Sequence, residues 1–147
     1  MCHTPACRQA GLAPTKHKSA MKLFHNSLKT KNFATGRWTE ALAAEYLVKL
    51  GYKIIECNHR TRWAEIDIVA NDRGCLVFVE VRSRSSEDYG RPEESINHAK
   101  ITRLIRNAES YAAHQRWPGS CRIDAVCIVF NSRRQAQRIS HYKNITF

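Results

Sequence analysis

Apolar and polar residues follow two kinds of pattern along the middle of the chain, one typical of helices and one typical of strands. In residues 36–50 apolar side chains recur at a spacing of three and four, which predicts an amphipathic helix that ends before Gly51. Runs rich in Ile, Val and Phe predict strands at 53–59, on both sides of a turn within 63–84, and at 122–130. We expect residues 33–147 to form one domain.

Residues 63–84 have the pattern of a β-hairpin. The segment 71–74 is rich in turn-forming residues, and apolar runs lie on either side of it. Every residue of 75–79 is apolar, which predicts a central strand that is covered on both faces. A polar loop is expected to follow at 83–91.

Acidic residues lie in both arms of this hairpin and would meet across it. Because alternate residues of a strand share a face, Glu65 lies on the face of Asp67, and Glu80 lies on the face of Arg82. A four-residue loop would place Glu65 opposite Glu80, whereas a two-residue loop would place Asp67 opposite Glu80. Both registers bring acids from the two arms together. A further acid, Glu40, lies on the inward face of the first predicted helix.

A second, long helix is predicted at 93–114. Its buried stripe consists of Ile101, Leu104, Ile105, Ala108, Tyr111 and Ala112. Lys100, Arg103 and Asn107 lie together on a flank of this helix, which would either contact phosphates or be a solvated face. Residues 139–147 are the candidates for a last strand. The order of helices and strands predicts an α/β fold, with a mixed sheet flanked by helices.

The formal charge of +11 is concentrated at the two ends of the chain. Residues 1–35 contain six basic residues and no acid, residues 131–147 contain four basic residues and no acid, and residues 36–130 are nearly neutral. Such ends suit a polyanion, because Lys and Arg displace condensed counterions from a phosphate backbone. Charge alone equally allows basic tails that only keep the protein soluble. We expect residues 1–32 to be a basic, disordered extension.

The cysteines and the hydropathy of the chain indicate a cytoplasmic protein. The six cysteines suggest no disulfide framework, because half of them lie in apolar runs where a free thiol acts as a small hydrophobe. No secretory signal precedes the domain, and the longest apolar run, at 125–130, is too short to cross a membrane. Cys2, His3 and Cys7 lie close together but lack the second cysteine pair of a structural zinc site.

The acids of the hairpin suit a divalent cation. Mg²⁺ or Mn²⁺ takes one or two carboxylates, which Asp67 and Glu80 would supply from adjacent strands, with Glu40 as a further oxygen ligand. Such an ion activates water and stabilises charge on a scissile phosphate. Arg82 would add a fixed positive charge; because its pKa is too high for a general base, Glu65 or a phosphate oxygen would accept the proton. The alternative is a row of exposed ion pairs, worth about 0–1 kcal/mol each.

Several ordered motifs resemble those of the bacterial YraN family. They are G-x-x-x-E at 36–40, N-x-R-x-x-x-x-E-I-D-I-V at 58–69, F-V-E-V-R-x-R at 78–84, G-R-P-E-E-S-I-x-x-x-K-x-x-R-L at 90–104 and R-I-D-A-V at 122–126. The resemblance covers about 36–130 and implies a restriction-endonuclease-like α/β/α sandwich, similar to that of archaeal Holliday junction resolvases. It marks Glu40, Asp67 and Glu80 as metal-binding acids and Arg82 as the basic position that ends the nuclease motif.

Two residues depart from the family pattern, and they leave two functions open. Arg82 stands where the nuclease motif usually has Lys, and Ala64 stands where the family usually has Gly. The first hypothesis is a Mg²⁺- or Mn²⁺-dependent endonuclease for DNA, with branched DNA as one candidate substrate; the second is a nucleic-acid-binding module that keeps the nuclease fold without cutting. The third hypothesis is a protein-interaction domain whose basic ends do not bind nucleic acid. Arg84, Lys100 and Arg103 are expected to grip phosphates, and by analogy with resolvases the protein would be a homodimer.

Overall fold

The computed structural model describes residues 35–61, 64–86 and 90–146, so the predicted basic extension at 1–32 lies outside the described residues. The elements in chain order are α2 (Thr35–Lys49), β1 (Lys53–Arg60), β2 (Glu65–Asp72), β3 (Cys75–Arg84), the 3₁₀ helix η1 (Pro92–Ser95), α3 (His98–His114), β4 (Cys121–Phe130) and β5 (Ala136–Tyr142). None of the described helices is long and apolar enough to cross a membrane.

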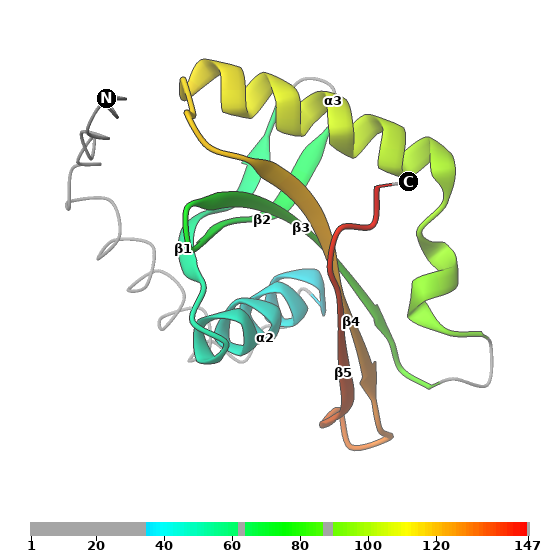
Figure 1. Cartoon of the computed structure of the whole chain (residues 1–147). Coiled ribbons are helices and arrows are strands. Elements are labelled where there is room, and N and C mark those ends of the chain that lie inside the picture. The colour runs from blue at the N-terminus through cyan, green and yellow to red at the C-terminus, as the bar shows by residue number, and fades with distance from the viewer. Residues whose placement is uncertain (1–34, 62–63, 87–89, 147) are drawn as a thin grey trace, which may run out of the picture.

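The strands form one mixed sheet in the order β1-β2-β3-β4-β5, with β3 at its centre (Figure 1). Neighbouring strands are antiparallel except for β3 and β4, which are parallel. A parallel pair needs a long crossover connection, and α3 is part of the one that joins β3 to β4. The predicted mixed sheet is confirmed.

The two α-helices cover opposite faces of the sheet (Figure 1). Val77 and Val79 of β3 lie in the core beneath α2, whereas Leu76 and Phe78 lie in the core beneath α3. All four side chains are buried, as expected for a strand that is apolar on both faces. The result is an α/β/α sandwich compatible with the restriction-endonuclease-like fold.

The turn between β2 and β3 fixes the register of the acid-bearing hairpin. Asp72 pairs with Cys75, so only Arg73 and Gly74 form the loop. Both loop residues have positive φ, 51° and 91°, which is the backbone of a tight type I′ turn. The two-residue register is therefore confirmed and the four-residue register is wrong. Continued past the last paired residues, this register places Asp67 opposite Glu80.

The predicted helix at 93–114 is interrupted. Pro92–Ser95 forms only a 3₁₀ helix, Ile96 is extended, and α3 begins at His98. The interruption has a local cause, because the side chain of Asn97 accepts a hydrogen bond from the Lys100 backbone N–H at 2.9 Å and caps α3.

The predicted flank of Lys100, Arg103 and Asn107 is also divided. Asn107 is buried and accepts a hydrogen bond from Thr61 Oγ1 at 3.0 Å, and Arg103 is exposed. The flank is therefore neither a continuous phosphate-binding row nor a uniformly solvated face.

Two strand boundaries differ from the sequence pattern. Ser83 and Arg84, expected in a loop, extend β3 by pairing with Ile128 and Val129 of β4. The last strand covers Ala136–Tyr142 instead of 139–147. In both cases polar residues continue a strand because a neighbouring strand supplies backbone partners, which leaves no trace in hydropathy.

A buried carboxylate joins β4 to β5 and to the segment that follows β5. Asp124 is fully buried and accepts hydrogen bonds from Arg122 Nε at 3.0 Å, from His141 Nε2 at 2.9 Å and from the Asn144 backbone N–H at 2.9 Å. Burial alone would raise the pKa of Asp124, but the bonds from His141 and Arg122 hold it below its usual value. Arg122 also pairs with Asp72 at 2.8 Å, which ties the network to the β2–β3 turn.

Replacing Asp124 with Ala is expected to lower the free energy of unfolding by about 3–5 kcal/mol, because Arg122 and His141 lose a buried partner. The matched change Asp72→Ala removes a partly exposed partner of the same Arg122 and should lower it by about 1 kcal/mol or less. Urea unfolding of both variants measures the difference. Equal losses would show that Asp124 contributes no more than a surface ion pair.

Candidate active site

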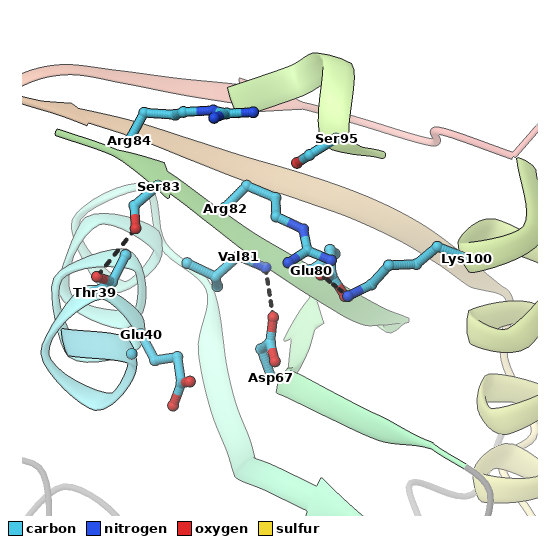
Figure 2. A pocket seen from close by; sticks show the side chains of 11 residues that line it. Thr39, Glu40, Asp67, Glu80, Val81, Arg82, Ser83, Arg84, Ser95 and Lys100 are labelled. Atoms are coloured by element: carbon cyan, nitrogen blue, oxygen red, sulfur yellow. Dashed lines mark hydrogen bonds and ion pairs between the residues drawn. The ribbon is translucent and has the colours of Figure 1, made fainter. Parts of the chain in front are cut away.

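A pocket of about 410 Å³ lies over the second half of β3, between α2 and the start of α3 (Figure 2). The residues that line it are Gly36, Thr39, Glu40, Asp67, Glu80, Val81, Arg82, Ser83, Arg84, Ser95 and Lys100. It therefore contains three acids and three bases contributed by α2, β2, β3 and α3. Charged groups of both signs in one concave site are typical of functional pockets.

Glu40 enters the pocket from α2 and is held by β1. The Asn58 side-chain amide donates a hydrogen bond to the Glu40 carboxylate. Asn58 has a φ of 54°, a left-handed conformation that Asn adopts more readily than most residues. Burial raises the pKa of Glu40, the bond from Asn58 opposes this rise, and the negative charge of Glu65 adds to it.

Asp67 lies at the floor of the pocket beside β3. Its Oδ2 accepts a hydrogen bond from the Val81 backbone N–H at 2.7 Å, so β3 itself orients the carboxylate (Figure 2). Burial, and then the negative charges of Glu80 and Glu40, raise the pKa of Asp67 to about 7, although the Val81 bond and the positive charge of Lys100 work against the rise. The acids of the pocket thus repel one another, and a cation between them would relieve that repulsion.

Glu80 is 1% exposed and is paired with two cations. Its Oε1 lies 2.6 Å from Lys100 Nζ and 2.8 Å from an Arg82 terminal nitrogen (Figure 2). Lys100 can reach it because the Asn97 cap sets the start of α3. Arg82 Nε is buried and has no hydrogen-bond partner among the described residues.

The structure brings most of the predicted site residues together. Glu40, Asp67, Glu80, Arg82, Arg84 and Lys100 line the pocket. Glu65 does not; it is exposed and pairs with Arg60 Nε at 2.9 Å. Arg103 is exposed on α3 and also lies outside the pocket lining.

Several polar residues of the site were missed in the sequence. Thr39 and Ser83 line the pocket with their hydroxyl oxygens 3.5 Å apart, and Ser95 enters it from η1. Asn58 orients Glu40 from another element. Period-2 counting along β3 would have placed Ser83 on the face of Val81, but the contribution of η1 and the Asn58 contact depend on tertiary packing and have no local signal.

The donor types fit Mg²⁺ or Mn²⁺, but the carboxylates are not gathered around one point. Within 35–61, 64–86 and 90–146, no group of three His, Cys, Asp or Glu side chains is close enough to hold a metal ion. The reason is the pairing of Glu80 with Lys100 and Arg82, which directs that carboxylate away from a shared centre. Glu40 and Asp67 remain as oxygen donors whose mutual repulsion a divalent cation would reduce.

The pKa of Asp67 generates a pH prediction. Because it is about 7 in the folded protein and near 3.8 ordinarily, the folded state holds a proton that the unfolded chain releases as pH rises from 4 to 7. The free energy of unfolding should fall over that window, and Asp67→Asn should remove the fall and raise stability at pH 8 by on the order of 2 kcal/mol. Thermal unfolding at several pH values tests this, with exposed Glu45→Gln as control. An unchanged pH profile in Asp67→Asn would show that Asp67 is ionised throughout.

The segment of the chain that forms this fold and pocket matches a known protein family. The model of the uncharacterised protein family UPF0102 matches residues 39–128, a range that includes every acid and base of the pocket.

Relatives from several bacteria carry the same family description. A UPF0102 protein of Persephonella marina is 44% identical over 110 residues, which are 74% of this chain and 90% of the relative. One from Herpetosiphon aurantiacus is 42% identical over 118 residues, 77% of this chain and 94% of the relative. One from Dehalococcoides mccartyi is 46% identical over 95 residues, 64% of this chain and 78% of the relative. The chain therefore belongs to the UPF0102 family, which is the YraN family that its motifs resemble.

Proposed function

We propose that this protein is a nucleic-acid-binding phosphodiesterase that cleaves DNA with Mg²⁺ or Mn²⁺. One observation carries the proposal: the pocket over β3 combines Glu40, Asp67 and Glu80 with the bases Arg82 and Lys100. Acids that repel one another attract a divalent cation, and bases beside them attract phosphate. Phosphodiester hydrolysis uses both features at the same place.

Asp67 and Glu40 are the residues that would hold the ion, because their carboxylates are not engaged by a basic side chain in any described ion pair. When bound, the ion supplies a polarised water and a positive charge beside the scissile phosphate. The Val81 backbone N–H holds one oxygen of Asp67, so the other oxygen would be left to bind the ion. Asn58 restrains Glu40 in the same way.

Arg82 and Lys100 would bind the phosphate. Both pair with Glu80, and a phosphate oxygen in the pocket would compete with that carboxylate for them. Because Glu65 lies outside the pocket, a substrate phosphate oxygen is the better candidate for the proton acceptor.

The rival function is a module that binds nucleic acid without cutting it. The pairing of Glu80 with two bases favours this rival, because a carboxylate neutralised in this way is a poor ligand for a metal. The Arg at position 82, where nucleases of this fold usually have Lys, favours it as well. Metal-dependent cleavage therefore decides between the two functions.

We extend the proposal to the DNA substrate, the oligomeric state and the cellular compartment of the protein. By analogy with resolvases, branched DNA would be a substrate and a two-fold homodimer the active form. We place the protein in the cytoplasm, since the described cysteines, Cys57, Cys75, Cys121 and Cys127, are all free.

Purified protein with Mg²⁺ or Mn²⁺ is expected to cleave at least one of three DNA substrates: four-way junction, duplex or single strand. Asp67→Asn and Glu80→Gln should each lower the rate by about 100-fold or more, because the first removes a carboxylate that would hold the ion and the second removes the charge that positions Arg82 and Lys100. Glu45→Gln, an exposed acid on α2, is the matched control.

Three outcomes of this experiment are informative. Equal cleavage by all variants would indicate a contaminating nuclease and contradict the site. Salt-dependent binding without cleavage by the wild type would establish the binding module instead. Neither binding nor cleavage would exclude both functions.

Arg82→Lys is expected to retain or raise any cleavage activity. Lysine keeps the positive charge beside Glu80 and is the residue that the nuclease motif usually has at this position. Single-turnover rates of the variant and the wild type test this. A complete loss of activity would mean that the planar guanidinium fork itself binds the substrate.

A further inference from the structure

The hairpin of β4 and β5 ends in a basic turn that the pocket does not use. Residues 131–135 form this turn, and Arg133 and Arg134 within it are exposed. Neither of these two residues pairs with an acid in the described part of the chain. The turn and β5 contain no acid at all, so the two guanidinium groups have no acid on their own hairpin.

The turn is ordered by its own hydrogen bonds. Asn131 Oδ1 accepts bonds from the backbone N–H groups of Arg133 at 3.0 Å and Gln135 at 2.9 Å. Asn131 N–H donates to the Gln135 carbonyl, and Arg134 N–H donates to the Asn131 carbonyl, both at 2.9 Å. Because the backbone is fixed before any ligand arrives, binding through these arginines loses little backbone entropy.

The hairpin lies at the same end of the sheet as the pocket. β4 is parallel to β3, with Glu80 level with Ala125 and Arg84 level with Val129. The turn begins after Phe130 and projects beyond the body formed by the helices, at the bottom of the view in Figure 1. From Ala125 to Phe130 the strand advances about 17 Å at about 3.3 Å per residue.

A charged contact fixes the hairpin relative to the pocket. Glu93 of η1 binds Arg138 at 2.8 Å and the Tyr142 hydroxyl at 2.7 Å, both on β5. The same short helix contributes Ser95 to the pocket lining. An element that lines the pocket therefore also contacts the hairpin directly.

We propose that the β4–β5 hairpin is a duplex-binding element whose Arg133 and Arg134 contact phosphates about five base pairs from the level of Glu80, given about 3.4 Å per base pair. The inference rests on the proposed function, because it assumes that nucleic acid occupies the pocket. A separation of about half a helical turn suits duplex DNA, whose major groove admits a two-stranded β-ribbon. A flexible single strand would not require a rigid element at this distance.

The test compares two pairs of arginines in the full-length protein. Arg133→Ala/Arg134→Ala removes the basic turn. Arg73→Ala/Arg116→Ala is the matched control, because both residues are exposed and lie at the opposite end of the sheet, and both, like Arg134, have positive φ. Binding to a labelled duplex of about 20 base pairs and to its single strand is measured by fluorescence anisotropy across a salt series, without divalent metal. Thermal unfolding confirms that each variant is folded.

The hairpin variant is expected to lose about tenfold or more in duplex affinity, and the slope of log K against log salt should fall by about 2, one for each lost phosphate contact. The control pair should change duplex affinity by about twofold or less, and Arg133→Lys/Arg134→Lys should restore binding because it restores the charge.

Other results overturn the inference in distinguishable ways. If the wild type binds duplex and both arginine pairs weaken binding equally, the hairpin assignment fails and the proposed function stands. If the hairpin variant loses equal affinity for duplex and single strand, its assignment to duplex fails. If the wild type binds neither DNA, the inference and the proposed function fail together.

Discussion

A carboxylate that is almost completely removed from water needs opposite charge close by, and at Glu80 that need determines how α3 lies against β3. The charge comes from Arg82, two residues along the same strand, and from Lys100 in the first turn of α3. Lys100 is in range because Asn97 caps α3 and the helix begins at His98. Glu80 can thus be buried because the helix is interrupted between η1 and α3, which brings Lys100 beside it. The central strand β3 can run between the two cores because the charge of Glu80 is neutralised.

The pocket combines two opposite electrostatic arrangements within one cavity. Burial raises the pKa of both Asp67 and Glu40, and neither is in a described ion pair, while Glu80 is neutralised by two bases. The unpaired acids Asp67 and Glu40 favour binding of a cation. Glu80 with its two bases resembles a buried ion pair that only supports a fold. Under the proposed function, the choice between cutting and only holding nucleic acid depends on which arrangement persists when a phosphate enters and competes for Arg82 and Lys100.

Much of this fold follows from the sequence because its elements have strong periodic patterns. The helix α2, the central strand β3 and the meeting of acids from both arms of the hairpin could be predicted from spacing, but the register that places Asp67 opposite Glu80 could not. Spacing does not show that Ser83 and Arg84 remain in a strand, since β4 supplies their partners. Spacing also does not show that Lys100 points inward while Arg103 points outward, because both lie on one flank of α3. Only the charged partner of Lys100, Glu80 on another element, distinguishes the two residues. Boundaries and pairings of polar residues depend on neighbours that are distant in sequence.

The two-residue turn between β2 and β3 makes chain length part of the site. Arg73 is exposed and touches none of the pocket residues, so its identity has little influence on the acids. An insertion or deletion of one residue there would have a much larger effect wherever it shifts the register of β3, because every side chain of that strand would then move to the opposite face of the sheet. Asp67 and Glu80 would then lie in different cores, on opposite sides of the sheet. Substitutions in this turn are therefore tolerated, whereas changes in its length are not. A gap between Asp67 and Glu80 in a sequence alignment would identify a relative that has lost the pocket.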